Sequence, residues 1–222
     1  SVAALSSDLS IIFNGLKQRY ATQKIGLIGH SFGGMATIEA IQNNVSPDFM
    51  ILLGTAVEKN GAFVIHGFEN DFKNKANIPV KNKSEEEIIE FFKEFFEIIA
   101  TSPDREVMFN TATTMIERRG FEKGFIRLLD NRQMVEMVSK DYEATLEETD
   151  IPTLYLVGSN DRNINVEKEI ALMRSFENSN ITVELFDGLN DYLTNRNAMV
   201  GSSVYVMDQS PLTKIINWTK DK

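Results

Sequence analysis

One hexapeptide constrains the fold of this chain more than any other feature: Gly29-His30-Ser31-Phe32-Gly33-Gly34. It follows an apolar run at 24–29, which is typical of a strand buried on both faces. It precedes small residues at 31–40, which are typical of a helix packed close to that strand. A strand that turns directly into a helix around Gly-x-Ser-x-Gly strains the serine backbone, so the residues two positions away must lack bulk. Gly29 and Gly33 meet that need, and the pattern predicts a tight turn at Ser31.

A serine at this turn can carry chemistry. Its hydroxyl would sit at the N-terminus of the following helix, where the dipole and the amide of Phe32 favour a developing oxyanion. The alternative is a glycine-rich turn with no chemistry. Two nucleotide-binding motifs are excluded, because Gly26, Gly29 and Gly33 lack the Gly-x-Gly-x-x-Gly spacing and no Gly-Lys-Ser/Thr occurs.

The remaining pattern predicts an α/β fold with a mostly parallel sheet and a helical insertion. Further strands are predicted at 49–54, 152–158 and 181–186, the last alternating and therefore nearer an edge. Helices are predicted at 1–20, 166–176 and from Ser210-Pro211 to about 220. No convincing strand occurs between 56 and 150. Within this stretch, Ser84-Glu85-Glu86-Glu87 is a capping box before a phenylalanine-rich helix, and Pro103 opens another helix. A further helix is predicted at 125–138. We therefore predict a core formed by 1–55 and 151–222 and an insertion at 56–150.

Composition excludes several classes of site. The chain has 222 residues, a net charge of -9, no cysteine and two histidines, His30 and His66. Disulfides, thiolate catalysis and zinc sites built on cysteine or several histidines are excluded, and an acidic chain is a poor partner for nucleic acid. Asp161-x-Asn163-x-Asn165 is not a calcium loop, because Val166 and Leu172 stand where glycine and glutamate are needed. We expect no metal and no cofactor.

Four motifs together resemble the α/β-hydrolase superfamily, in its bacterial esterase and serine-aminopeptidase-like branch. They are the hexapeptide at 29–34, Gly158-Ser159-Asn160-Asp161 after a strand, Gly188-Leu189-Asn190, and Ser210-Pro211 before a helix that contains Trp218. The chain is similar to the C-terminal two-thirds of such an enzyme. The resemblance implies that Ser31 is the nucleophile, that Asp161 is the acid of the triad and that the insertion is a lid. An ordinary turn role is the alternative for Asp161.

One departure from the family pattern is informative. Members of this kind usually carry histidine after Gly-Leu-Asn, and this chain carries Asp191. A free aspartic acid has a pKa of about 3.9, so its carboxylate is a poor base toward a serine hydroxyl. Asp161 and Asp191 close together would also repel unless one held a proton. His30 is expected to point away from the Ser31 hydroxyl as a structural residue, and His66 lies in an apolar run, where packing or capping is the usual role.

A second departure concerns the sheet. The family's second oxyanion amide comes from a loop after an earlier strand, which this chain lacks. That strand would pair with 24–29, so we expect an apolar open edge there. Either a homo-oligomer forms through this edge, or the sheet is rearranged so that another segment covers it.

Three hypotheses follow for function. The first is a serine hydrolase acting on small-molecule carboxylic esters or amides, impaired by Asp191. The second is a non-catalytic binding protein that uses the lid pocket, and the third is a segment of a longer chain. No apolar run is long enough to span a membrane, and no signal peptide is visible, although the chain begins at Ser1 without methionine. We expect a soluble protein, with the cytoplasm favoured as its compartment.

Overall fold

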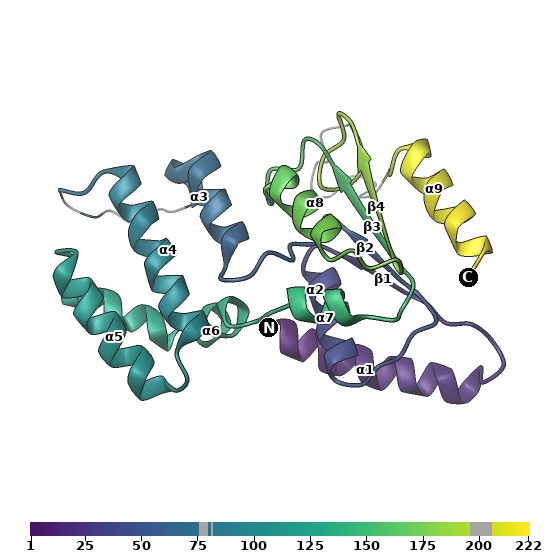
Figure 1. Cartoon of the computed structure of the whole chain (residues 1–222), viewed down its shortest axis with the longest axis horizontal. Coiled ribbons are helices and arrows are strands. Elements are labelled where there is room, and N and C mark those ends of the chain that lie inside the picture. The colour runs from purple at the N-terminus through teal and green to yellow at the C-terminus, as the bar shows by residue number, and fades with distance from the viewer. Residues whose placement is uncertain (76–79, 81, 196–205) are drawn as a thin grey trace. The chain divides into compact units, whose positions relative to one another are not determined.

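The computed structural model describes residues 1–75, 80, 82–195 and 206–222. They form two compact units (Figure 1). The sheet unit comprises Ser1–Val57 and Tyr142–Lys222, and the helical unit comprises Glu58–Asp141. The helical unit is inserted in the chain between the second and third strands of the sheet unit.

The sheet has four described strands, all parallel, in the order β1-β2-β3-β4. They span Leu27–His30, Met50–Leu53, Thr153–Gly158 and Ile181–Phe186. The predicted α/β class and parallel sheet are confirmed, and the bounds of β4 are those predicted. Among the described strands, β1 and β4 are the two edges.

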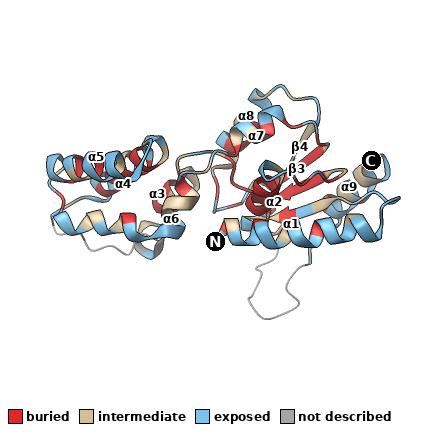
Figure 2. Ribbon diagram, turned by 90° about the horizontal axis from the view of Figure 1, so that it is seen from below, coloured by how far each residue is buried: buried red, intermediate tan, exposed pale blue. Residues whose placement is uncertain are grey.

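Helices pack on both faces of this sheet. The helices of the sheet unit are α1 (Val2–Arg19), α2 (Phe32–Gln42), α7 (Glu143–Glu148), α8 (Val166–Ser175) and α9 (Gln209–Lys220), of which α7 packs against α2. Phe13 of α1 and Ala40 of α2 form a cluster against which Leu27 packs. The opposite face of the sheet contributes Ile51 and Leu154 to a cluster that Trp218 of α9 covers. The central strands β2 and β3 are buried along their whole length, whereas the edge strands β1 and β4 are mostly half-buried (Figure 2).

The helical unit has its own apolar core. Its helices are α3 (Ala62–Lys75), α4 (Glu85–Thr101), α5 (Arg105–Arg118), a 3-10 helix η1 (Lys123–Asp130) and α6 (Arg132–Val138). All four phenylalanines of α4, at 91, 92, 95 and 96, are buried. The wide apolar stripe of this helix is thus explained by contacts on more than one side.

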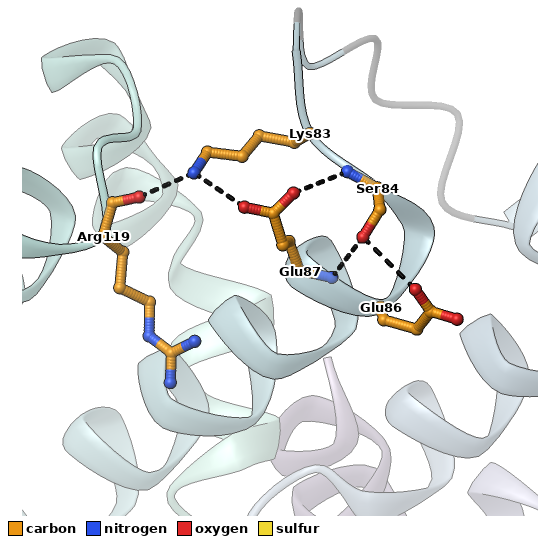
Figure 3. A network of polar contacts seen from close by, with 5 residues as sticks. All are labelled: Lys83, Ser84, Glu86, Glu87 and Arg119. Atoms are coloured by element: carbon orange, nitrogen blue, oxygen red, sulfur yellow. Dashed lines mark hydrogen bonds and ion pairs between the residues drawn. The ribbon is translucent and has the colours of Figure 1, made fainter.

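The capping box that the sequence predicts for α4 is confirmed. The Ser84 hydroxyl accepts a hydrogen bond from the Glu87 amide at 3.2 Å, and the Ser84 amide donates to the Glu87 carboxylate at 2.9 Å (Figure 3). The Lys83 ammonium bridges the Glu87 carboxylate and the Arg119 carbonyl. This network fixes the start of α4 against the end of α5.

Several helix boundaries differ from those predicted. Asp104, not Ser102, caps α5, because its carboxylate accepts from the Val107 amide, so Pro103 lies before the helix. Residues 125–138 divide between a 3-10 helix and α6, because Asn131 caps a new helix at that point. The final helix begins at Gln209, and Pro211 lies inside its first turn. None of the helices among the described residues is both long and apolar enough to cross a membrane.

Candidate active site

Ser31 connects β1 to α2 with a backbone conformation that only a few per cent of non-glycine residues adopt. Its φ is 51° and its ψ is -119°. The Ser31 amide donates to the Leu53 carbonyl at 2.9 Å, so the turn remains attached to β2. The Ser31 carbonyl accepts from the amide of Gly34, which closes the first turn of α2. These bonds hold the strained residue at the carboxyl edge of the sheet.

The glycines around Ser31 have different roles from those that the sequence pattern suggests. A Cβ on Gly29 would lie 2.5 Å from the Gly33 carbonyl oxygen, so this position cannot carry a side chain without movement. A Cβ on Gly33 would meet nothing within 4 Å, and the expected steric requirement there is wrong. The tightest position is Gly34, where a Cβ would lie 1.9 Å from the Thr55 hydroxyl oxygen. Close packing of α2 on the segment after β2 is what requires that glycine.

Asp161 follows β3, as predicted, and is buried. Its carboxylate accepts a hydrogen bond from the Asn163 amide at 2.8 Å. The other carboxylate oxygen lies 3.1 Å from the point that a Cβ would occupy if residue 54 were not glycine. The φ of Gly54 is +49°. Gly54 therefore lets the segment after β2 approach the Asp161 carboxylate.

Asp191 lies beside the same point. Its carbonyl oxygen is 3.2 Å from the Cβ position of Gly54, and its carboxylate accepts from the Asn163 side-chain amide at 3.1 Å. Asn163 thus bridges the two aspartates, with its main chain on Asp161 and its side chain on Asp191. Sequence analysis considered Asn163 only as part of a calcium pattern and missed this role.

The turn that carries Asp191 is fixed by its own hydrogen bonds. The Asn190 side-chain oxygen accepts from the amides of Tyr192 and Thr194, at 2.9 and 3.2 Å. The ring nitrogen Nε2 of His30 lies 2.9 Å from the Asp191 carbonyl oxygen, and its ring centroid is 5.2 Å from that of Tyr192. Because His30 precedes Ser31, this contact brings position 191 next to the strained turn.

Phe32 and His66 occupy different environments. Phe32 is the first residue of α2, and its side chain is exposed. Its main-chain amide remains the predicted oxyanion donor. His66 lies on α3 in the helical unit, where its Nε2 is 2.7 Å from the side-chain amide nitrogen of Asn70.

The segment that leaves β2 is anchored by buried polar groups. The Tyr155 hydroxyl donates to the Thr55 carbonyl at 2.8 Å, and both oxygens of the Glu169 carboxylate lie 3.1 Å from the Val57 amide nitrogen. Burial, with the nearby charges of Glu169 and Asp161, raises the pKa of Tyr155 well above its ordinary value. Tyr155 is therefore a neutral hydrogen-bond donor at physiological pH. Within the described ranges, no group of three or more histidine, cysteine, aspartate or glutamate side chains could hold a metal ion.

Comparison with known families identifies this scaffold. The profile of the family described as serine aminopeptidase, S33, matches residues 1–195. The chain belongs to this family. The parallel α/β sheet is consistent with this assignment.

Solved structures were also compared, and of the three named next, the one with a TM-score above 0.5 shows a similar fold. A candidate lipase from Acinetobacter baumannii AYE has 15% identity and a TM-score of 0.52, and the alignment covers all of this chain and 68% of the other. An esterase from Exiguobacterium antarcticum has 13% identity and a TM-score of 0.49, with 97% and 74% covered. An esterase from Rhodococcus sp. ECU1013 has 15% identity and a TM-score of 0.46, with 99% and 72% covered. A comparison with curated protein sequences found no match.

Within this S33 member, three residues that the sequence singles out lie near one another. Ser31, Asp161 and Asp191 all lie beyond the carboxyl ends of strands. The Ser31 amide donates a hydrogen bond to the carbonyl of Leu53, and the next residue, Gly54, lies against both aspartates. Asn163 donates hydrogen bonds to the carboxylates of both aspartates. Parallel α/β sheets present their ligand-binding loops at the carboxyl edge.

Proposed function

We propose that this chain carries the acyl-transfer site of a serine hydrolase, with Ser31 as the nucleophile toward small-molecule carboxylic esters or amides. The observation that supports the proposal most directly is the φ of 51° at Ser31, between β1 and α2. Such strain persists only where the surrounding structure enforces it, and it is concentrated at functional sites. The family match over residues 1–195 supports the same chemistry.

The proposed reaction has two steps. The Ser31 oxygen bonds to the carbonyl carbon of the substrate, the hydroxyl proton passes through a base to the leaving alcohol or amine, and an acyl-serine remains. Water then bonds to the acyl carbon, the bond from that carbon to the Ser31 oxygen breaks, and the carboxylic acid leaves while a proton returns to the serine oxygen. The Phe32 amide is the proposed donor to the oxyanion, because it lies at the start of α2, where amides point out of the helix. Asp161 is the proposed acid of the triad.

We further propose that the site is impaired, because Asp191 stands where the imidazole base is expected. Loss of a triad base lowers turnover by up to about a millionfold, or roughly 8 kcal/mol of barrier. The Asp191 carboxylate also already accepts a hydrogen bond from Asn163. It is therefore poorly placed to exchange protons with a substrate. The insertion predicted at 56–150, of which Glu58–Asp141 form the helical unit, is proposed as the lid from its place in the chain between β2 and β3.

The test compares the chain with its Ser31→Ala variant in two assays. We expect slow labelling of Ser31 by a fluorophosphonate and only a trace of nitrophenyl acetate hydrolysis, both absent in Ser31→Ala. Ser7→Ala is the matched control, because Ser7 is an exposed serine on α1. Turnover at ordinary enzyme rates would contradict the impairment, and equal labelling of both variants would contradict the nucleophile.

The Asn163–Asp191 contact favours a second candidate, a non-catalytic binding protein on the same scaffold. A carboxylate fixed in this way can serve as a recognition group without transferring a proton. Binding of a non-hydrolysable ester analogue that is retained in Ser31→Ala and lost in Asp191→Ala would favour this candidate over the hydrolase.

We also propose that a second copy of this chain pairs with the β1 edge. The amides of Leu27 and Ser31 donate hydrogen bonds to carbonyls of β2 and of the residue before it. Because the N–H and C=O groups of successive residues in a strand point to opposite sides, the main-chain groups of Ile28 point toward the open edge. The Ile28 side chain is 60% exposed, whereas its neighbours in register, Ile51 and Leu154, are fully buried. Two such edges can pair antiparallel about a two-fold axis, since each surface is then its own complement.

Light scattering tests this pairing. We expect a dimer for the unmodified chain and a monomer for Ile28→Lys, because an edge lysine disfavours strand pairing. The control is Leu185→Lys on β4 at the opposite edge, where the side chain is similarly exposed, and this variant stays dimeric. A monomeric unmodified chain, or dissociation of both variants, would contradict the proposal.

A further inference from the structure

The residue before the candidate nucleophile makes a contact that the proposed mechanism does not use. His30 is 161 positions from Asp191 in the sequence, yet its Nε2 lies 2.9 Å from the Asp191 carbonyl oxygen. A carbonyl oxygen only accepts hydrogen bonds, so Nε2 carries the proton and donates. The basic lone pair of the neutral ring is then on Nδ1, and Nε2 is not available as a base toward Ser31.

The His30 ring is held on a second side by Tyr192. The two centroids are 5.2 Å apart with the planes tilted by 37°. The side chain of Asp191 is held separately, by the Asn163 amide at 3.1 Å. The main chain of residue 191 is thus attached to β1 through His30, and its side chain is attached to the loop after β3 through Asn163.

We propose that His30 is a positioning residue that fixes the main chain of position 191 beside the Ser31 turn. Its importance for catalysis rests on the proposed function, in which position 191 is where the triad base belongs. His30 does not itself take part in proton transfer. It acts by keeping the turn at 190–192 within reach of Ser31, whatever side chain position 191 carries.

Two substitutions separate the hydrogen bond from the ring contact. His30→Phe keeps a planar ring beside Tyr192 but removes the donor. His30→Gln removes the ring but offers an amide N–H at a reach similar to that of Nε2. A role in packing alone predicts that phenylalanine is the better replacement, whereas the positioning role predicts that glutamine is.

The first measurement is independent of activity. The chain has two histidines, so nitrogen NMR of the unmodified protein and of His30→Phe assigns the His30 ring signals by difference. We expect the Nε2–H tautomer for His30. We also expect faster amide hydrogen exchange at 191–193 in His30→Phe and restored protection in His30→Gln. An Nδ1–H tautomer, or exchange that phenylalanine leaves unchanged, would overturn the proposal.

The second measurement uses Asp191→His, which supplies the expected imidazole. In that background His30→Phe should lower kcat on the order of 100-fold, since a misplacement of about 1 Å has this effect. KM should change little and His30→Gln should recover most of kcat. His66→Phe is the control, because His66 lies in the helical unit, and it should leave kcat unchanged. Should Asp191→His itself be inactive, the proposed function fails, while the tautomer and exchange measurements still decide the role of His30.

Discussion

Gly33 and Gly34 are adjacent in α2, and the structure predicts opposite effects for the same substitution at the two positions. Gly34→Ala places a Cβ 1.9 Å from the Thr55 hydroxyl oxygen and 2.7 Å from its methyl group. Overpacking of this kind destabilises by about 1–3 kcal/mol. Gly33→Ala meets no atom within 4 Å and stabilises by about 0.5–1 kcal/mol, because alanine restricts the unfolded chain and favours the helix. The free energies of unfolding of the two variants should therefore differ by roughly 1.5–4 kcal/mol.

The assay follows unfolding of the sheet unit through its own probe. Trp218 is the single tryptophan of the chain and packs against Phe49, with centroids 5.9 Å apart. Its fluorescence in a thermal or urea titration reports this unit. A difference of 1 kcal/mol shifts the melting temperature by about 2–4 °C in a chain of this size.

A double-mutant cycle identifies the cause. Thr55→Ala removes the two atoms nearest to the new Cβ, so the cost of Gly34→Ala should fall in that background. If Gly34→Ala is as stable as Gly33→Ala, or if Thr55→Ala leaves its cost unchanged, the packing argument at this turn is refuted.

Three further predictions concern single contacts. Ser84→Ala should cost about 1 kcal/mol and speed hydrogen exchange in α4, whereas Ser84→Thr keeps the cap. The hydrogen bond from Lys17, and next the one from the Ile25 amide, lower the pKa of the Asp48 carboxyl. The carboxylate therefore stabilises the fold above its unfolded pKa of about 3.9, and this stabilisation is lost as pH falls through the folded pKa. In acid titrations, Asp48→Asn should lose stability less steeply than the unmodified chain. Burial raises the pKa of Tyr155, so its contribution to stability is complete below about pH 10 and falls above it. Absorbance titration should show fewer tyrosines ionising in the folded protein than in the unfolded, and Tyr155→Phe should reduce that difference by one.

Local sequence patterns were sufficient for the strands and for one cap. Each strand is a short apolar run, and β4, whose residues alternate, is at an edge of the described sheet. Ser84 and Glu87 were identified as a capping box because both partners lie within four residues. The sequence pattern does not predict α3 as a separate helix. Its apolar residues at 63–68 form a run and not a helical stripe, and Asp71 interrupts it with non-helical dihedrals.

The candidate site shows where such reasoning ends. Ser31 and Asp161 each follow a strand, and local sequence is enough to place them there. The contacts of Asp191 with His30 and Asn163 join residues 161 and 28 positions apart, and no local pattern encodes them. The requirement for glycine at position 34 likewise comes from Thr55, in the segment after the next strand. These features depend on how strand ends meet in three dimensions.

The most direct test of the account is the rate of nitrophenyl acetate hydrolysis by Asp191→His, compared with the unmodified chain and with Asp191→His/Ser31→Ala. Asp191 lies beside Asp161 and next to the Ser31 turn, so an imidazole at this position should restore a base where the proposed reaction needs one. A positioned general base contributes about 100-fold to 10,000-fold, and a gain of at least the lower value is expected, lost again in the double variant. A rate that Asp191→His leaves unchanged, or a gain that persists without the Ser31 hydroxyl, would contradict the claim that Ser31 and position 191 form one hydrolytic site.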